Sequence, residues 1–174
     1  MQEVQTLLKR NSATMTTHRV LQAKPVLNTA VLSCIDARAD PAHFLDLQPG
    51  EAVVLRNAGG RVTDDVERQL GLLGFFSRQM GPEMFKLIIV HHTDCGVERM
   101  EDPDVTAKVS AVSGVSQDYV SSIAIHDHDH AASLRADVER LNASRLVPAG
   151  IHVTALIYDH ETGAVRTEFE AVTR

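Results

Sequence analysis

The sequence has no long hydrophobic run, no excess of basic side chains and only two cysteines. Its longest apolar stretches, such as residues 87–90 (LIIV), cover about four residues, whereas a membrane-spanning helix needs roughly 20. With 23 acidic against 17 basic side chains, the formal net charge is −6. Such a chain has no overall positive field to attract nucleic acid. We therefore expect a protein that neither crosses a membrane nor binds nucleic acid.

The rest of the composition is that of an ordinary globular protein. Hydrophobic residues make up 44% and charged residues 23% of the 174 residues, which argues against a collagen-like, low-complexity or disordered chain. This length suits one domain, so we expect a single domain over residues 1–174. The N-terminus lacks the apolar core of a secretory signal, although its Arg, Ser and Thr leave an organelle-targeting signal open. We expect a cytoplasmic protein.

Short apolar runs alternate along the chain with segments of helical periodicity. Five segments have the pattern of strands: 28–35, 51–56, 85–91, 151–159 and 164–169. Three have the spacing of helices: 41–47, 63–79 and 131–142. Residues 101–127 are less patterned, and we expect a loop with short helical pieces there. The alternation predicts an α/β fold with a central, mostly parallel β-sheet flanked by helices.

The first 25 residues are expected to form an arm outside this sheet. Val4, Leu7 and Leu8 recur at helical spacing, and a polar stretch follows at residues 11–17. We therefore predict an N-terminal helical arm, residues 1–25, that packs on something other than its own sheet.

Three potential metal ligands lie at the ends of predicted strands. Cys34 ends the first strand, and His92 and Cys95 follow the third. If these strands are parallel neighbours, the three side chains collect at the carboxyl edge of the sheet, where α/β proteins bind ligands. Two thiolates and one imidazole are a known catalytic zinc set, which leaves the fourth tetrahedral position for water or another ligand.

Residue types and spacing alone leave other interpretations open. Cys34 and Cys95 could be buried apolar thiols beside a hydrogen-bonded turn histidine. They could also form one disulfide, although in a reducing compartment a distant pair near histidines is more often a metal or catalytic site. A structural zinc site with four protein ligands is the third alternative.

The pattern C-x-D-x-R at residues 34–38 adds a carboxylate and a guanidinium to the first cysteine. Paired with Arg38, Asp36 stays ionised and can be oriented. Released from Arg38, the same carboxylate could occupy the fourth zinc position. An ordinary surface ion pair in a solvated turn is the simpler alternative.

With these motifs, the sequence resembles the β-class carbonic anhydrases. That family carries C-x-D-x-R and, further along, H-x-x-C, here H-T-D-C at residues 92–95. The resemblance covers residues 26–100 well and includes QPGEA at 48–52 and RNAG at 56–59. Pro25 and Val53 depart from the plant-type pattern, so the chain is similar to the short microbial branch of the family.

The resemblance implies a function and a site. It implies that Cys34, His92 and Cys95 hold one Zn²⁺ per chain, with Asp36 and Arg38 as a dyad beside the metal-bound water. The implied reaction is the reversible hydration of carbon dioxide to bicarbonate and a proton by zinc-bound hydroxide. The family builds its active sites at a dimer interface, with the arm lying on the partner, so a homodimer or a dimer of dimers is expected.

Two other functions use the same motifs. Related hydrolases of carbon disulfide or carbonyl sulfide share the ligands and the dyad. The motifs do not separate these substrates from carbon dioxide, because access and pocket shape determine which substrate is used. A non-catalytic zinc-binding or redox-sensing protein would exchange its metal for a disulfide between Cys34 and Cys95. The presence of Asp36 and Arg38 argues against that role, since sensing needs neither.

Four further histidines and one aspartate receive structural interpretations. His126, His128 and His130 alternate with acids and are expected in a solvated loop rather than in a relay or a second metal site. His91 is expected to be a core or interface side chain, because neighbouring residues at a strand end point to opposite sides. Asp94 is interpreted as a turn residue.

Overall fold

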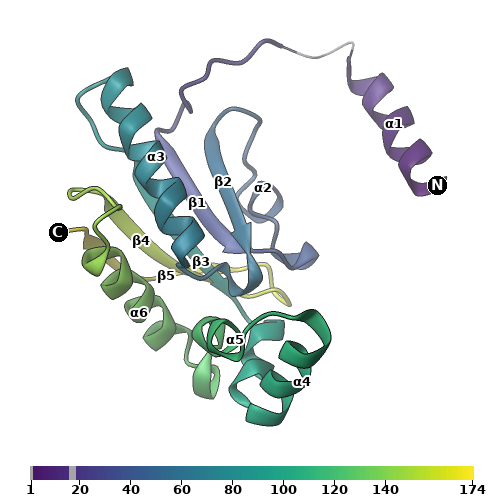
Figure 1. The fold of residues 1–174 in the computed structure, drawn as a ribbon. Coiled ribbons are helices and arrows are strands. Elements are labelled where there is room, and N and C mark those ends of the chain that lie inside the picture. The colour runs from purple at the N-terminus through teal and green to yellow at the C-terminus, as the bar shows by residue number, and fades with distance from the viewer. Residues whose placement is uncertain (1, 16–18) are drawn as a thin grey trace.

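A computed structural model describes residues 2–15 and 19–174 and shows a five-stranded sheet in the order β2-β1-β3-β4-β5 (Figure 1). The strands are β1 (Thr29–Cys34), β2 (Ala52–Asn57), β3 (Lys86–His92), β4 (His152–Tyr158) and β5 (Val165–Val172). All pairs are parallel except β4 with β5, which is antiparallel. The predicted α/β fold with a mostly parallel central sheet is confirmed.

Helices connect the strands and cover both faces of the sheet. The α-helices are α1 (Gln2–Thr14), α2 (Pro41–Phe44), α3 (Asp64–Met80), α4 (Pro103–Ser113), α5 (Gln117–Ile123) and α6 (His130–Ala143). Short 3-10 turns complete the connections: η2 (Ala37–Ala39), η3 (Ala58–Gly60), η4 (Gly96–Glu101) and η5 (His126–His128).

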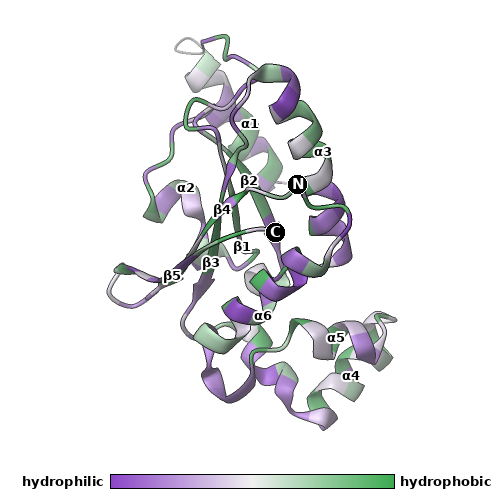
Figure 2. Cartoon of the chain, turned by 90° about the vertical axis from the view of Figure 1, so that its left-hand side faces the viewer, coloured by the Kyte–Doolittle hydropathy of each residue, from purple (hydrophilic) through white to green (hydrophobic). Residues whose placement is uncertain are grey.

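The core has two parts, one on each face of the sheet. On one face, Leu32 of β1 belongs to a buried cluster with Leu70 of α3 and Leu134 of α6. The preceding residue, Val31, lies on the other face and belongs to a second cluster that includes Ile123 of α5. This alternation is the period of two of an extended strand, here buried on both faces. Figure 2 shows the hydrophobic strands between more polar helices.

The segment expected to be a loop with short helical pieces is more helical than that. Residues 101–127 contain α4 and α5 as well as parts of η4 and η5. Only Thr106 of α4 is buried, and Val112 is 90% exposed. Such a helix carries no continuous apolar stripe, so its sequence lacks the periodicity from which a helix is recognised.

The N-terminal arm contains the predicted helix, α1, which lies away from the sheet (Figure 1). None of the described residues of α1 is buried. The predicted arm, 1–25, includes residues 1 and 16–18, which lie outside the described residues. Among the helices that the structure describes, none is long and apolar enough to cross a membrane.

The topology brings the ends of β1, β3 and β4 together. β1 pairs with β3 up to Ser33 and Val90, and β3 pairs with β4 up to His92 and Tyr158. Gly60 of η3 packs against this edge with φ +66, and a Cβ there would lie 2.9 Å from the Val90 carbonyl oxygen. Since parallel strands point the same way, the residues after each strand share one edge of the sheet.

Candidate metal centre

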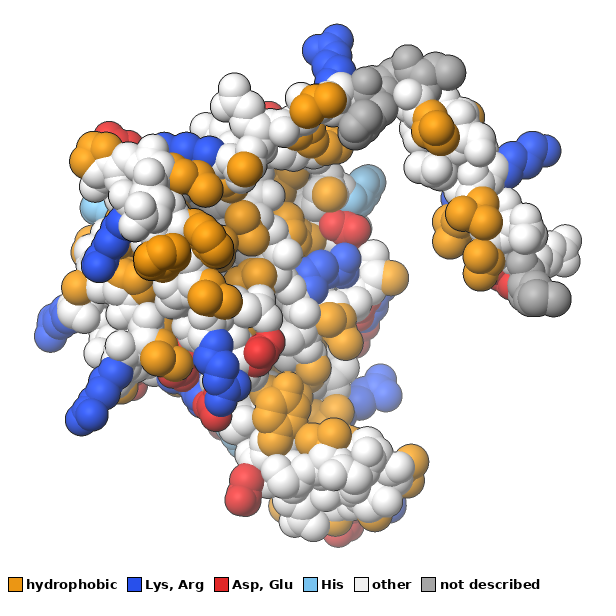
Figure 3. Space-filling model, turned by 45° about the horizontal axis from the view of Figure 1, so that its top comes forward, with side chains coloured by type: hydrophobic (Ala, Val, Ile, Leu, Met, Phe, Trp, Pro, Cys, Tyr) orange, Lys and Arg blue, Asp and Glu red, His pale blue; other side chains and the backbone are white. Residues whose placement is uncertain are grey.

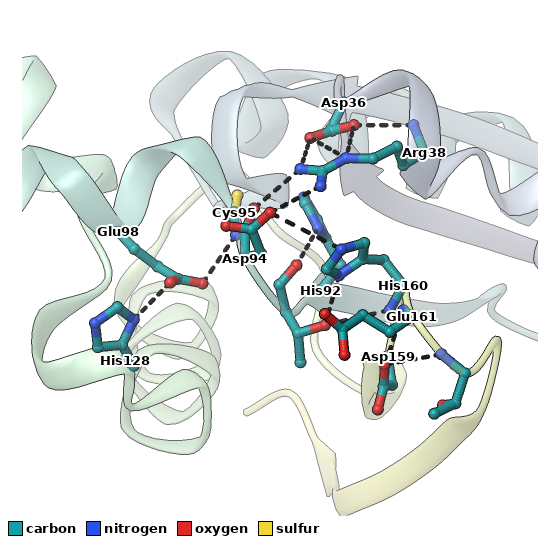
Figure 4. A network of polar contacts seen from close by, with 12 residues as sticks. Asp36, Arg38, His92, Asp94, Cys95, Glu98, His128, Asp159, His160 and Glu161 are labelled. Atoms are coloured by element: carbon teal, nitrogen blue, oxygen red, sulfur yellow. Dashed lines mark hydrogen bonds and ion pairs between the residues drawn. The ribbon is translucent and has the colours of Figure 1, made fainter.

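The three predicted ligands lie together at the carboxyl edge of the sheet. Cys34, His92 and Cys95 are 4%, 1% and 3% exposed. Their candidate ligand atoms all lie within 4.8 Å of one another, and no other group of this kind is found among the described residues. The two sulfur atoms are 3.8 Å apart. β1 supplies one donor and the end of β3 with its following turn supplies the other two (Figure 4).

The separation of the sulfur atoms fits two ligands of one tetrahedral ion. Both cysteines are free, and a disulfide would need sulfur atoms about 2.05 Å apart. Two thiolates bound to zinc at about 2.3 Å with a tetrahedral angle have sulfur atoms roughly 3.8 Å apart. The spacing therefore matches shared coordination rather than a covalent bond.

The imidazole of His92 has the orientation of a ligand. Its Nδ1 lies 3.0 Å from the carbonyl oxygen of Thr93, which fixes that nitrogen as the donor. Its Nε2 is buried and has no hydrogen-bond partner in the described part of the chain. A buried polar atom without a partner is costly. A metal ion at this position would remove that cost, so the donor set fits zinc.

Electrostatics at the centre favour one thiolate even without a metal. The hydrogen bond with Cys95 lowers the pKa of Cys34 to about 4. The same hydrogen bond and burial raise the pKa of Cys95. Burial opposes a charge on His92, but contact with Cys34 outweighs it and raises the pKa of His92. The hydrogen bond between the two sulfur atoms thus favours one thiolate on this pair, and a metal held by both cysteines requires the second proton to leave as well.

The predicted pair of Asp36 and Arg38 is formed. Arg38 donates from Nη2 to Oδ2 of Asp36 at 2.7 Å and from Nε to Oδ1 at 3.1 Å. The Arg38 guanidinium holds the pKa of Asp36 well below its usual range. The backbone N–H of Asp36 also donates to Sγ of Cys34 at 3.4 Å. The carboxylate is thus ionised and held beside the first cysteine.

Further residues hold the site and were missed by sequence reasoning. Arg56 donates to the carbonyl oxygens of Cys34, at 2.9 Å, and Asp36, at 2.7 Å. Glu98 accepts from the backbone N–H of Cys95 at 2.9 Å. Asp94 does adopt a left-handed turn conformation, as expected of a turn residue, but its carboxylate also accepts from Arg38 at 2.8 Å. Only the contact of Glu98 had a local signal in the sequence, because Glu98 lies three residues after Cys95, the spacing of a helix capping box.

The histidines outside the centre divide into buried and exposed ones. His91 is fully buried, as predicted for a core side chain. The expectation of a solvated loop is wrong for His130, which is only 8% exposed, and it holds for the exposed His128. Asp129 caps α6, so the helix begins at His130 and turns its ring toward His91, with ring centroids 5.8 Å apart. His128 in turn pairs with Glu98 at 2.5 Å.

Comparison with known proteins identifies the family. Residues 29–165 match the family described as carbonic anhydrase. Beta-carbonic anhydrase 1 of Mycobacterium tuberculosis is 30% identical over 143 residues, which cover 82% of this chain and 83% of that protein. The chain belongs to the β-class carbonic anhydrase family. The resemblance noted from the sequence motifs is therefore confirmed.

Solved structures and curated relatives extend this carbonic anhydrase assignment. The carbonic anhydrase of Streptococcus mutans is 33% identical and superposes with a TM-score of 0.79, over 97% of this chain and 99% of that one. Carbon disulfide hydrolase of Acidianus sp. is 29% identical, over 78% of this chain and 74% of that protein. Relatives named for two different reactions thus have nearly the same sequence identity to this chain.

Proposed function

We propose that this protein binds one zinc ion per chain through Cys34, His92 and Cys95 and catalyses the reversible hydration of carbon dioxide to bicarbonate and a proton. The observation that carries the proposal is the geometry of the donor set. Three protein ligands leave a fourth position free, which is the pattern of catalytic rather than structural zinc sites. Family membership and the Asp36–Arg38 pair beside the donors support the same conclusion.

Each residue has a chemical role in this reaction. Cys34 and Cys95 would hold the cation as thiolates, and His92 would hold it through Nε2. Zinc, when bound, would lower the pKa of water toward neutrality and so supply the nucleophile. Asp36, kept ionised by Arg38, would accept a hydrogen bond from the attacking oxygen and so orient it toward the substrate carbon. The new carbon–oxygen bond gives bicarbonate, and one proton passes to the buffer.

A second candidate is hydrolysis of carbon disulfide or carbonyl sulfide at the same site. It is favoured by the curated relative named carbon disulfide hydrolase, which is 29% identical to this chain. The same ligands and dyad suit carbon dioxide, carbon disulfide and carbonyl sulfide, because each reaction begins with attack on the central carbon. The two candidates are therefore separated by assay rather than by residue identity.

We also propose that the protein works as a homodimer in which the arm contacts a second copy. Val4, Leu7 and Leu8 of α1 are 57%, 60% and 55% exposed, although their spacing is that of a buried helix face. Figure 3 shows hydrophobic side chains at the surface of the arm. Sedimentation of the full chain and of Leu7→Asp/Leu8→Asp tests this, and an unchanged mass in the variant contradicts it.

The main test measures carbon dioxide hydration by stopped flow on protein of known zinc content. We expect about one zinc per chain and turnover in the wild type. Cys95→Ser should lose zinc. Asp36→Ala should keep zinc but lose turnover by about a hundredfold, since one positioned proton acceptor contributes 10²- to 10⁴-fold. Asp46→Asn, at an exposed aspartate that makes no contact with the donor set or the Asp36–Arg38 pair, is the control.

Three results would count against the proposal. Full zinc without hydration, but with turnover of carbon disulfide, would favour the second candidate. Full zinc with neither activity would favour a non-catalytic role. Full activity in Asp36→Ala would remove Asp36 from the mechanism.

A further inference from the structure

Arg38 lies between two carboxylates, and only one of them belongs to the C-x-D-x-R motif. Its Nε and Nη2 bind Asp36. Its Nη1 donates to Oδ2 of Asp94 at 2.8 Å, and Nη2 also donates to the backbone carbonyl oxygen of Asp94 at 3.0 Å. Asp94 thus contacts both terminal nitrogens of the guanidinium. Asp36 thus holds the Nε–Nη2 edge of this planar group and Asp94 holds the Nη1–Nη2 edge.

The backbone at Asp94 is what allows this double contact. Asp94 has φ +53, in the left-handed region that most side chains avoid. Aspartate and asparagine tolerate this conformation better than other residues. A residue held in such a conformation beside a functional site is a reason to look for a role. Here the left-handed turn presents the carbonyl oxygen and the carboxylate of one residue to the same arginine.

The turn that carries Asp94 is itself anchored to β4 and to the loop after it. The N–H of Thr93 donates to the carbonyl oxygen of Tyr158 at 3.0 Å. Oγ1 of Thr93 accepts from the backbone N–H of His160 at 3.2 Å and contacts Nδ1 of His160 at 3.0 Å. Figure 4 shows Asp36, Arg38, Asp94 and His160 side by side. The row joins the loops that follow β1, β3 and β4.

We propose that Asp94 is a positioning residue that holds the Arg38 guanidinium so that Nε and Nη2 face Asp36. Its consequence for turnover rests on the proposed carbon dioxide hydration, in which Asp36 orients the reacting water. Without Asp94, Arg38 keeps its bonds to Asp36, but its Nη1 end loses the partner that fixes the plane. The dyad is then ordered for a smaller fraction of the time.

The alternative is an ordinary surface ion pair with no effect on the site. The side chains of Arg38 and Asp94 are 45% and 64% exposed, and pairs this exposed contribute little in most proteins. The effect of Asp94 is therefore expected to be small in fold-change. Two features distinguish this effect from that of a surface pair. Asp94 acts on Asp36 through Arg38, and the effect of replacing Asp94 disappears when Arg38 is absent.

The test uses Asp94→Asn, which removes the charge and keeps a side chain suited to the left-handed turn. Asp94→Gly, which adopts this φ without strain and leaves no side-chain acceptor, is the second variant. Asp46→Asn is the matched control, because Asp46 is an exposed aspartate with φ +51 outside the site. Stopped-flow hydration is measured on zinc-loaded protein, alone and in an Arg38→Ala background.

The second readout is independent of activity and of the proposed function. It is the exchange with water of the Nε–H proton of Arg38, followed by proton–nitrogen NMR and assigned by its loss in Arg38→Ala. We expect Asp94→Asn to raise the exchange rate by about two- to fivefold. It should lower kcat by a similar factor and leave KM nearly unchanged. In the Arg38→Ala background the same substitution should leave kcat unchanged, and Asp46→Asn should change neither readout.

Several outcomes overturn the proposal. One is unchanged Nε–H exchange in both Asp94→Asn and Asp94→Gly, since the amide oxygen of asparagine can still accept from Arg38. Another is an equal loss of kcat with and without Arg38, which would mean that Asp94 acts by another route. Faster exchange with unchanged kcat would support the positioning of Arg38 by Asp94 and overturn its consequence for turnover. If the wild type hydrates no carbon dioxide, the proposed function fails, while the exchange experiment still decides whether Asp94 positions Arg38.

Discussion

Asp137 is the residue whose replacement should most damage the fold around the metal centre. This α6 carboxylate is 2% exposed and accepts from Nε of Arg61 at 2.9 Å and from the backbone N–H of Val62 at 3.1 Å. Nε2 of His91, next to the candidate ligand His92, lies 3.3 Å away. One side chain thus ties α6 to the loop before α3 and to β3.

The expected magnitude follows from the burial of both charges. Arg61 is 7% exposed, so Asp137→Asn leaves a buried guanidinium without its counter-charge. Removing one partner of a buried ion pair costs about 3 to 5 kcal/mol. A domain of this kind has a total unfolding free energy of about 5 to 15 kcal/mol. The substitution should therefore remove a large part of the stability.

Urea unfolding followed by circular dichroism measures this change. Zinc is kept at one fixed saturating concentration, because any ligand of the native state adds stability that depends on its concentration. The control is Asp118→Asn, an exposed carboxylate in the first turn of α5, which should change the unfolding free energy by less than about 1 kcal/mol. The double variant Arg61→Gln/Asp137→Asn should be more stable than Asp137→Asn, since it removes the unpaired charge.

Two results would refute the reasoning. A loss below about 1 kcal/mol in Asp137→Asn would show that Arg61 is not an uncompensated buried charge in the variant. A double variant less stable than the single one would show that the hydrogen bonds of Arg61, rather than its charge, decide the outcome.

Two further predictions concern glycine geometry and acid stability. Gly60→Ala should lower the unfolding free energy by about 2 to 5 kcal/mol, since its Cβ would meet backbone atoms of Ser33, Cys34 and Val90 that cannot move aside. Gly114→Ala, with φ +73 and open space around it, should cost about 1 kcal/mol; equal losses in urea unfolding would contradict the steric argument. Burial lowers the pKa of His130. Below about pH 6.5 this histidine therefore binds a proton more readily in the unfolded state than in the folded state. The unfolding free energy should fall as the pH drops, by up to about 1 kcal/mol near pH 5.5. His130→Asn should flatten this dependence, measured by urea unfolding at about pH 7 and pH 5.5, and an unchanged slope would speak against it.

The strands and the three donors were predictable because their signals are local. Each central strand is a short apolar run followed by polar residues, and the rule for parallel sheets places Cys34, His92 and Cys95 at one edge. The boundaries were close: the second strand was predicted at 51–56 and is Ala52–Asn57. Tertiary hydrogen bonding decides such end residues, and a single sequence does not contain it.

The supporting contacts were not predictable because they join residues that are distant in sequence. Arg61 and Asp137 are 76 positions apart, and Arg38 and Asp94 are 56 apart. Each residue taken alone fits a plainer interpretation, such as a surface charge or a turn. His130 shows the same limit, since the alternating HDHDH run gives no sign that the cap at Asp129 turns this ring inward.

The spacing of the two cysteines along the chain has a consequence for how the protein opens. An ion held by Cys34 and Cys95 joins residues 61 positions apart and closes a loop that contains β2, α3 and β3. By the chain-entropy estimate for a covalent cross-link, a closed loop of this size is worth about 4 kcal/mol against the unfolded state. β5 lies outside this loop, at the edge of the sheet. Backbone amide exchange should therefore slow on metal loading in β2 and β3 more than in β5.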